Sequence, residues 1–357
     1  MNAEPREPAV ASVVEALERV LDRDPARTAA LAHALGARGP LAPLRPLVVP
    51  RGRADRLARA VTRTALDITR ALERRSVVMS LPGLADALQG SPPPVRSPEV
   101  LDVLRVDGVL AEDGTYTATA FHAGSAVEDL VEVERASDAM AAWYGDAVTV
   151  RWPRPATDVA RALVRRYGHG ARCAWVVSPG GLGRGDGVAE HAEAFARICH
   201  AEGLRCDPVE ADGLAYDGQA VSLDGAVIDV LLRRIAPVEW LCDERLGPLR
   251  DAALRRHVRL FVSPYDLLFN HRGALAVLSK ADHADPRGAV IPWTRVEDDR
   301  VVQRPVAAPL AALPFYVEGA LIRRETEVTV SPVVVRGAEG TLLARAPGLF
   351  PVVEPAR

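Results

Sequence analysis

Two adjacent arginines follow an apolar run in the stretch GAVIDVLLRRIAPVEWL, residues 225–241. The run from Val227 to Leu232 is rich in β-branched residues, which is typical of a strand buried on both faces. Burying an unpaired guanidinium is very costly, so Arg233 and Arg234 are expected where that strand ends. What the two charges face there is the first question about function.

Neighbouring residues of a strand point to opposite faces, so we expect at most one of Arg233 and Arg234 to contact a ligand. An arginine suits bidentate binding of a carboxylate or phosphate. The alternative is a structural salt bridge at the strand end, for which three acids are close in sequence: Asp229, Glu239 and Asp243.

A glycine-rich loop lies between a predicted strand and a predicted helix in VVSPGGLGRGDGVAEHAEAF, residues 176–195. Glycines let the backbone approach an anion closely, and the N-terminus of the following helix favours negative charge. Neither GxxxxGK nor GxGxxG is present, so this is no P-loop or dinucleotide fingerprint. Phosphate or carboxylate binding and a plain surface loop both remain open. The candidate anion-binding residues are Gly180, Gly181, Gly183 and Gly185.

Histidines supply two further candidates. His122 ends a predicted strand in FHAGS and could act as a general base, although a structural or surface histidine is the alternative. In FNHRGALAVLSK, Asn270 is a candidate N-cap, which places His271 and Arg272 in the first turn of a helix. Cations there oppose the helix dipole, so we expect an anionic neighbour or ligand. No GxSxG, HExxH or kinase-type motif is present.

The elements that must position these groups are those of an α/β protein in four parts. Residues 1–92 have the three- and four-residue spacing of helices, and 93–154 contain a hairpin and then a helix. Strands and helices alternate over 155–285, which predicts a Rossmann-like parallel sheet covered on both faces. Residues 286–357 are rich in strands and are expected to form an antiparallel sheet. Ligands of parallel sheets bind beyond the carboxyl ends of the strands, where Arg233 and Arg234 stand.

Composition excludes several classes of protein. A net charge of −3 favours neither a nucleic-acid nor a membrane-surface binder, and no apolar run approaches the length of a membrane span. The N-terminus lacks the pattern of a signal peptide, so we expect a cytoplasmic location. Four cysteines without metal-type spacing are interpreted as reduced, mostly buried thiols. Lys280 is the only lysine among 44 lysine and arginine residues, which is typical of a GC-rich bacterial genome.

Several segments in a shared order resemble the circularly permuted ATP-grasp proteins, including the glutathionylspermidine-synthase-like group. They lie within residues 100–350: RVDGVLAEDGTYTATAFHAG, GAVIDVLLRRIAPVEWL, VRLFVSPYDLLFNHRGALAVLSK, VVQRPV and VSPVVVRGAEGTLLAR. The resemblance implies a Rossmann-like pre-ATP-grasp domain and a reaction in which ATP activates a carboxylate for attack by an amine. It implies that Arg233 or Arg234 lies near the acyl substrate, and that His122 stands where the family often has an asparagine facing the substrate. Arg345 matches an arginine that contacts phosphate oxygens, so the resemblance makes His122 and Arg345 the catalytic candidates.

The chain also departs from that family. The family has a glycine-rich clamp containing lysine and proline before the last strands, whereas IPWTRVEDDRVVQRPV runs straight from one strand to the next. The family's magnesium ligands include a glutamate and an asparagine, and neither residue type occurs in the eight residues after Arg345. A triphosphate is normally neutralised by metal ions and positioned cations together. These departures predict a shortened nucleotide-binding region, with no metal site assigned.

Three functional hypotheses remain. The first is an ATP-grasp-lineage protein with a degenerate ATP site that binds a small anionic metabolite, an amino acid, a partner protein or a second copy. The second is an active ATP- and magnesium-dependent carboxylate–amine ligase with a rearranged site. Its cations would come from Arg323, Arg324, Arg336 and Arg345, and its magnesium ligands from Glu318, Glu325 or Glu327. The third is an enzyme that reuses the fold without ATP, with His122 as its base.

Overall fold

The described N-terminal residues are mostly helical. The computed structural model describes residues 10–36, 42–72, 102–111, 113–124, 126–184, 187–263, 267–270, 273–279, 289–292, 294–297, 300–335, 343–345 and 349–355. Its first elements are α1 (Val10–Arg23), α2 (Pro25–Gly36), β1 (Leu47–Val48) and α3 (Arg51–Leu72). The apolar stripes of these helices are buried: Leu17 and Leu21 pack with Tyr144, while Leu57 and Ile68 of α3 pack against the large sheet.

The large sheet is built around a hairpin that the sequence predicts. Strands β2 (Val103–Leu110) and β3 (Tyr116–Ala123) are antiparallel, and the helix α6 (Ala126–Tyr144) follows. The other strands of this sheet are short and come from distant parts of the chain: β1, β4 (Val150–Arg151), β16 (Thr329–Val330), β17 (Val333–Val335), β18 (Leu343–Arg345) and β19 (Leu349–Pro355). The pairing is antiparallel except between β1 and β19, which run parallel.

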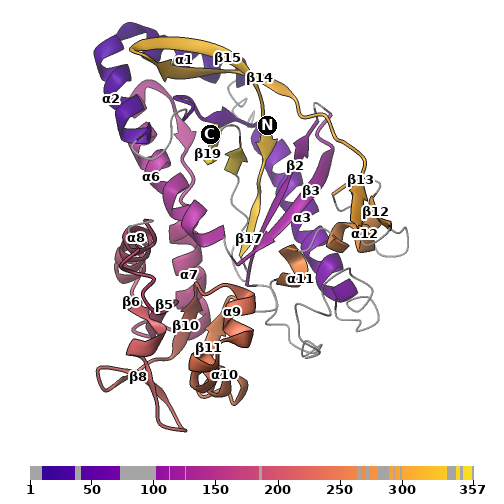
Figure 1. Cartoon of the computed structure of the whole chain (residues 1–357). Coiled ribbons are helices and arrows are strands. Elements are labelled where there is room, and N and C mark those ends of the chain that lie inside the picture. The colour runs from indigo at the N-terminus through magenta and orange to yellow at the C-terminus, as the bar shows by residue number, and fades with distance from the viewer. Residues whose placement is uncertain are drawn as a thin grey trace, which may run out of the picture.

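Strands of the second and fourth predicted parts therefore share one sheet, and the four part boundaries stay a prediction. Two separate hairpins also belong to the strand-rich C-terminal part. They are β12 (Thr294–Glu297) with β13 (Arg300–Gln303), and β14 (Leu310–Val317) with β15 (Ala320–Glu327). The β14–β15 hairpin lies beside α1 and α2 at the top of Figure 1.

A four-stranded parallel sheet forms the lower part of the molecule in Figure 1 and confirms the predicted Rossmann-like arrangement. Its order is β11 (Arg259–Phe261), β10 (Val230–Arg233), β5 (Arg172–Val177) and β6 (Arg205–Glu210). One face packs through Trp175 against Phe195, and the other through residues such as Val176 against Trp240. The helices that pack around it are α7 (Pro155–Tyr167), α8 (Val188–Ala201), α9 (Pro237–Cys242) and α10 (Gly247–Leu254).

The remaining elements are small. A three-stranded meander is formed by β7 (Ala215–Tyr216), β8 (Val221–Leu223) and β9 (Ala226–Val227), with Asp217 and Gly218 between its first two strands. Single turns of 3₁₀ helix occupy Gly145–Ala147, Ala211–Gly213 and Glu244–Leu246. Two short helices, α11 (Leu267–Asn270) and α12 (Gly273–Ser279), follow the parallel sheet. No helix in the described ranges combines the length and apolar composition needed to cross a membrane.

The four cysteines are free thiols, and Cys173, Cys199 and Cys206 are buried while Cys242 is half-buried. Burial raises the pKa of Cys173. A hydrogen bond with Cys199, together with burial, raises the pKa of Cys206. A thiol must lose its proton to become a good nucleophile, so these buried cysteines are core residues.

Candidate functional site

The carboxyl ends of β10 and β11 meet the start of β2, and the buried carboxylate of Asp102 joins them. Its Oδ2 accepts a hydrogen bond of 2.9 Å from the amide of Val262, and its Oδ1 forms an ion pair with Arg166 of α7. Val262 has φ of 68°, in the left-handed region that a β-branched residue rarely adopts. Backbone strain of this kind persists where neighbouring groups fix it, and it concentrates at functional sites.

The side chain of Arg233 binds backbone carbonyls at this junction. Its side chain is buried, and its Nε donates to the carbonyl of Val262 at 3.0 Å. The two terminal nitrogens donate to the carbonyls of Ile235 and Ser263. The guanidinium of Arg233 therefore satisfies backbone carbonyls where the chain leaves two strands, which is a structural role. Whether Arg233 also contacts a ligand stays a prediction.

Arg234 takes the opposite face, as the alternation along a strand predicts. It is half-buried, with its guanidinium carbon 5.9 Å from the centre of the Trp175 ring. Of the acids considered for a strand-end ion pair, Asp243 binds Arg245, and Asp229 accepts the amide of Arg172. Whether Arg234 binds a ligand stays a prediction.

His122 belongs to a charged cluster that the sequence did not reveal. Its Nε2 lies 3.1 Å from Oδ2 of Asp107, and Asp107 Oδ1 accepts a hydrogen bond of 3.0 Å from Arg105 Nε. Arg105 also forms an ion pair with Asp129 in the first turns of α6. The side chains of Arg105 and Asp107 are 6% and 8% exposed, whereas those of His122 and Asp129 are 35% and 42% exposed. A buried charge pair thus carries two partly exposed ionisable groups, which we call the His122 cluster (Arg105, Asp107, His122 and Asp129).

The β2–β3 hairpin creates this cluster through its register. His122 is directly opposite Arg105, and a bulge lies between Asp107 and Gly108. At Gly108 a Cβ atom would lie 2.3 Å from the carbonyl oxygen of Thr117, so only glycine fits. The sequence did contain a signal, because Arg105 and Asp107 alternate with apolar residues in LRVDGVL and so share one face of a strand.

The charge state of Asp107 is fixed by its surroundings. Burial by itself raises the pKa of Asp107. The hydrogen bond with His122, the charge of Arg105 and a contribution from Ser331 together outweigh burial and lower this pKa to about 2. Asp107 is therefore a carboxylate at neutral pH, able to hold the His122 ring in place.

The glycine-rich loop already binds an anion that belongs to the protein. The carboxylate of Glu210, at the end of β6, accepts the amides of Gly180 at 2.8 Å and Leu182 at 3.1 Å. Gly180 has φ of 72°, and a Cβ at Gly181 would lie 2.7 Å from the Ser178 carbonyl oxygen. An external anion would have to displace Glu210 or use other amides, so a role for Gly180, Gly181 and Gly183 in ligand binding stays a prediction.

The other candidates are placed only in part. Gly185, His271 and Arg272 lie outside the described residues. Asn270 ends α11, and its side-chain amide bonds the backbone of Ala123 through Oδ1 at 2.5 Å and Nδ2 at 3.2 Å, so it ties α11 to the end of β3 beside His122. The backbone of Arg345, in β18, pairs with that of Thr329 in β16, and a role for Arg345 in a site stays a prediction.

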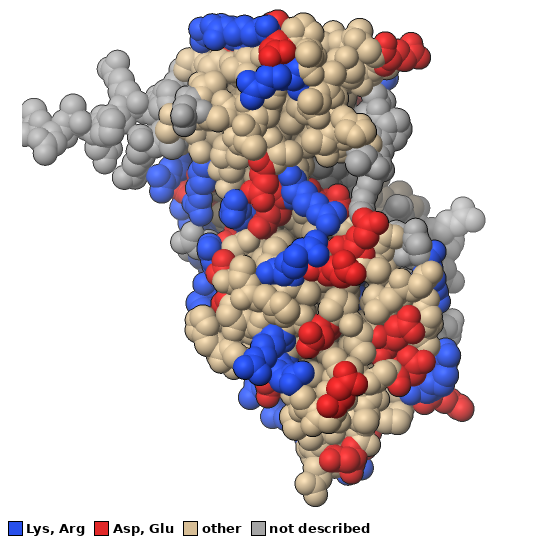
Figure 2. Space-filling model, turned by 90° about the vertical axis from the view of Figure 1, so that its left-hand side faces the viewer, with Lys and Arg blue, Asp and Glu red and all other residues tan. Residues whose placement is uncertain are grey.

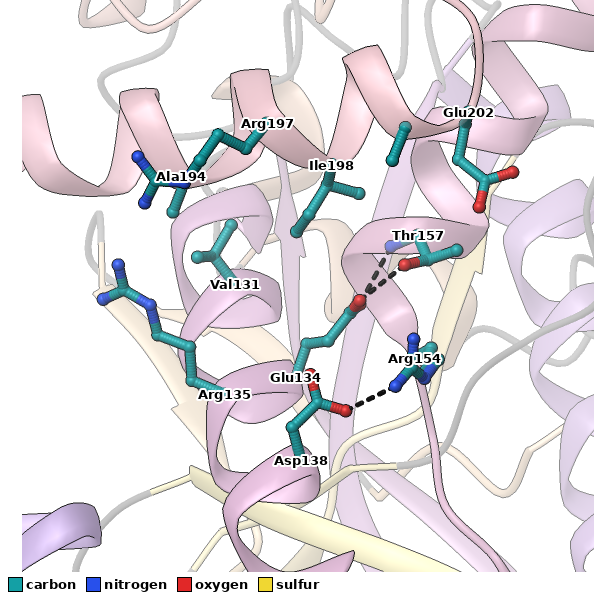
Figure 3. Close-up of a pocket in the computed structure, with 11 residues that line it drawn as sticks. Val131, Glu134, Arg135, Asp138, Arg154, Thr157, Ala194, Arg197, Ile198 and Glu202 are labelled. Carbon is teal, nitrogen blue, oxygen red and sulfur yellow. Dashed lines mark hydrogen bonds and ion pairs between the residues drawn. The ribbon is translucent and has the colours of Figure 1, made fainter. Parts of the chain in front are cut away.

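A pocket of about 360 Å³ lies between α6, the first turn of α7 and α8 (Figure 3). At its centre the buried Glu134 accepts hydrogen bonds from the amide of Thr157 at 2.9 Å and its hydroxyl at 2.5 Å. Burial raises the pKa of Glu134, although the bonds from Thr157 oppose the shift. Glu134 thus satisfies donors at the start of α7, a capping role for a side chain 23 residues away in sequence.

The remaining charges around this pocket also have partners. Arg154 donates to Asp138 at 2.7 Å, as the dashed line in Figure 3 marks. Arg135, Arg197 and Glu202 pair with Glu132, Glu193 and Arg161, respectively. Figure 2, which views the side of the molecule that carries α6 and α8, shows basic and acidic side chains next to one another. This pocket therefore offers no unbalanced charge to attract a ligand.

The described residues contain no group of three or more His, Cys, Asp or Glu side chains arranged to hold a metal ion. No protein-family model matches the chain, and no curated protein does either. Among solved structures, a glutathione synthetase-like effector (GSS30) from Globodera pallida, in its apo form, has a TM-score of 0.61 with 11% sequence identity. The similarity covers 99% of this chain and 100% of that chain. The chain therefore has a mixed α/β fold similar to that of this glutathione synthetase-like protein.

Proposed function

We propose that this chain is an ATP-grasp-lineage protein, similar to carboxylate–amine ligases, whose ATP site is degenerate and which binds a small amino-acid-like ligand. The fold similarity supports the lineage. The degenerate site and the ligand are inferred from the residues of this chain.

The short connection between β12 and β13 is the main support for a degenerate ATP site. The antiparallel register pairs Glu297 directly with Arg300, which leaves two positions between the strands. A glycine-rich clamp with its lysine and proline needs a longer insertion at this point. The pairing therefore supports a chain that passes from one strand to the next without the segment that closes over a nucleotide.

One cation considered for a rearranged ATP site already has other partners. Arg323 of β15 forms ion pairs of 2.8 Å with Glu18 and 2.7 Å with Asp22 on α1. Glu318 lies in the β14–β15 turn with φ of 49°. The described residues contain no group of three or more metal-ligating side chains, and we derive no step through ATP.

The His122 cluster supports an amino acid as the ligand. Asp129 is 42% exposed and presents a carboxylate suited to an ammonium group, while Arg105 holds it in place from the buried side. His122 is the other partly exposed member and would donate to a ligand carboxylate when protonated. Arg234, at the carboxyl end of β10, stays a separate candidate for binding a carboxylate. Groups of both signs favour a zwitterion over a simple anion.

Thermal unfolding in the presence of each common amino acid and of small dicarboxylic acids tests this proposal. A ligand that binds only the native state raises its stability by about 2.7 kcal/mol at a hundredfold excess over its Kd. We expect at least one amino acid to stabilise the native protein, with about tenfold weaker binding in His122→Ala and Asp129→Asn.

Asp138→Asn is the matched control, because Asp138 is also an exposed acid of α6 in an ion pair with one arginine. It should bind like the unaltered protein. If no amino acid stabilises the protein, or if Asp138→Asn weakens binding as much as Asp129→Asn, the proposed ligand site is wrong.

A further inference from the structure

A second pocket lies at the opposite end of the parallel sheet. Its volume is about 550 Å³, and three segments line it: 166–171 after α7, 227–229 before β10, and 256–259 leading into β11. These residues stand at the amino ends of the strands, whereas Arg233 and Val262 stand at the carboxyl ends. We call it the amino-end pocket. An inference from it does not depend on the proposed function.

The lining of this pocket is strongly basic. One lining residue, Asp229, is acidic, and it uses Oδ2 to accept the amide of Arg172 at 2.8 Å. The basic residues come from both loops that flank the sheet edge: Arg166, His169, Arg256, His257 and Arg259.

Two of these charges are not neutralised by the protein. Arg166 is compensated by the buried carboxylate of Asp102. Arg256 and Arg259, by contrast, form no ion pair with any residue in the described ranges. An arginine is always charged at physiological pH, so Arg256 and Arg259 outweigh the carboxylate of Asp229 and leave the amino-end pocket with an excess of about one positive charge. The pocket in Figure 3 differs in this respect, because its charges are paired.

The basic groups are also held in position. The guanidinium carbons of Arg166 and Arg259 lie 5.1 Å and 5.9 Å from the centre of the Tyr167 ring. His257 Nδ1 is 2.7 Å from the hydroxyl of Tyr216.

The backbone of Arg256 and the ring of His169 are also constrained. Arg256 has φ of 61°, in the left-handed region that favours glycine. The ring of His169 packs so closely on Gly203 that a Cβ there would lie 2.2 Å from Nδ1. Preorganised donors lose less conformational entropy when a ligand binds.

We propose that the amino-end pocket binds a phosphate group, either as the free ion or as the monoester of a small metabolite. A tetrahedral dianion can accept hydrogen bonds from two guanidinium groups and from imidazole N–H donors at once. The volume is within the range of small-molecule sites and exceeds what the ion alone requires. The exposed side chain of Val227 and the ring of Tyr167 line the same pocket and provide a surface for an organic part of the ligand.

Isothermal titration calorimetry with inorganic phosphate, glucose 6-phosphate, glucose and citrate tests this proposal at about 50 mM salt, where screening is weak. The pocket variant is Arg256→Gly combined with Arg259→Ala, since glycine keeps the left-handed backbone at residue 256. The control variant is Arg245→Ala combined with Arg255→Ala. It removes two exposed arginines that lie outside the pocket and pair with Asp243 and Asp251. Thermal unfolding verifies that each variant folds.

The proposal predicts that a phosphate compound binds the unaltered protein, binds the control variant within about twofold, and binds the pocket variant at least about tenfold more weakly. Glucose should not bind. Tighter binding of glucose 6-phosphate than of phosphate assigns the site to a monoester, and equal binding assigns it to the free ion. The proposal is overturned if neither phosphate compound binds, if both variants lose the same affinity, or if citrate binds more tightly than both phosphate compounds.

Discussion

Nε2 of His122 lies 3.1 Å from Oδ2 of Asp107, and the buried guanidinium of Arg105 is bound to the other oxygen of that carboxylate. The two strands of one hairpin therefore place an acid, a base and a fixed cation side by side. Because Asp107 is almost fully covered, its charge depends on these partners, and its titration reports whether the cluster is formed.

The pH dependence of stability tests the charge on Asp107. Its pKa is lowered from 3.8 to about 2 in the folded protein, so its contribution to stability is complete above pH 4 and is lost as the pH falls toward 2. The linkage relation gives a loss of about 1 kcal/mol between pH 5 and pH 3. We expect this part of the loss to be absent in Asp107→Asn, as measured by urea unfolding at both pH values. An unchanged difference between pH 5 and pH 3 in that variant would contradict the assignment.

The same substitution leaves Arg105 buried with one acidic partner fewer. Breaking a buried charge pair typically costs about 3 kcal/mol, so Asp107→Asn should lower the free energy of unfolding at pH 7 by about that amount. Asp138→Asn removes an acid whose side chain is 53% exposed, and should change the free energy of unfolding by less than about 1 kcal/mol.

Arg233 and Arg234 should differ in their effect on stability. Arg233→Met leaves the carbonyls of Val262, Ile235 and Ser263 without their buried donor, and we expect a loss of about 3 kcal/mol. Arg234→Met removes a half-buried guanidinium near the Trp175 ring and should cost about 1 kcal/mol. Urea unfolding at pH 7 measures both. Equal losses would mean that Arg233 does not hold the junction as described.

Glu210 should control the order of the glycine-rich loop. Glu210→Gln weakens the acceptor for the amides of Gly180 and Leu182, so their hydrogen exchange should become about tenfold faster. Glu202 follows the C-terminal end of α8, far from the glycine-rich loop, and pairs with Arg161 of α7. Glu202→Gln should therefore leave hydrogen exchange in the loop unchanged. Slow exchange in Glu210→Gln would show that something other than this carboxylate orders the loop.

Local patterns in the sequence predict much of the fold. The β2–β3 hairpin, α6 and the alternation from α7 to β11 follow from periodicity and turn residues, which act over short distances along the chain. The pairing of β1 with β19 cannot be predicted from such local patterns, because Leu47 and Val352 are far apart in sequence and neither strand has a distinctive pattern. Register and partner choice between such short strands depend on the whole core.

The candidate site, like the fold, is predictable from the sequence only where the signal is local. His122 and the two arginines are identifiable because chemistry-bearing residues end predicted strands. Asp102 could not be identified from the sequence, because its role depends on contacts with Arg166 and Val262, which are 64 and 160 residues away. Glu210 shows that a loop with anion-binding geometry can be satisfied by the protein's own carboxylate, which no spacing rule reveals.

The most direct test of the account is a thermal-shift titration of the unaltered protein with ATP and magnesium, with ADP and metal-free ATP as controls. The direct β12–β13 connection predicts no magnesium-dependent stabilisation at millimolar ATP. A nucleotide present at a hundred times its Kd would raise the native-state stability by about 2.7 kcal/mol, which such a titration detects readily. Absence of a shift, alongside stabilisation by an amino acid, is the result the account predicts. A saturable, magnesium-dependent shift with ATP would contradict it and would favour an active ligase with a rearranged site.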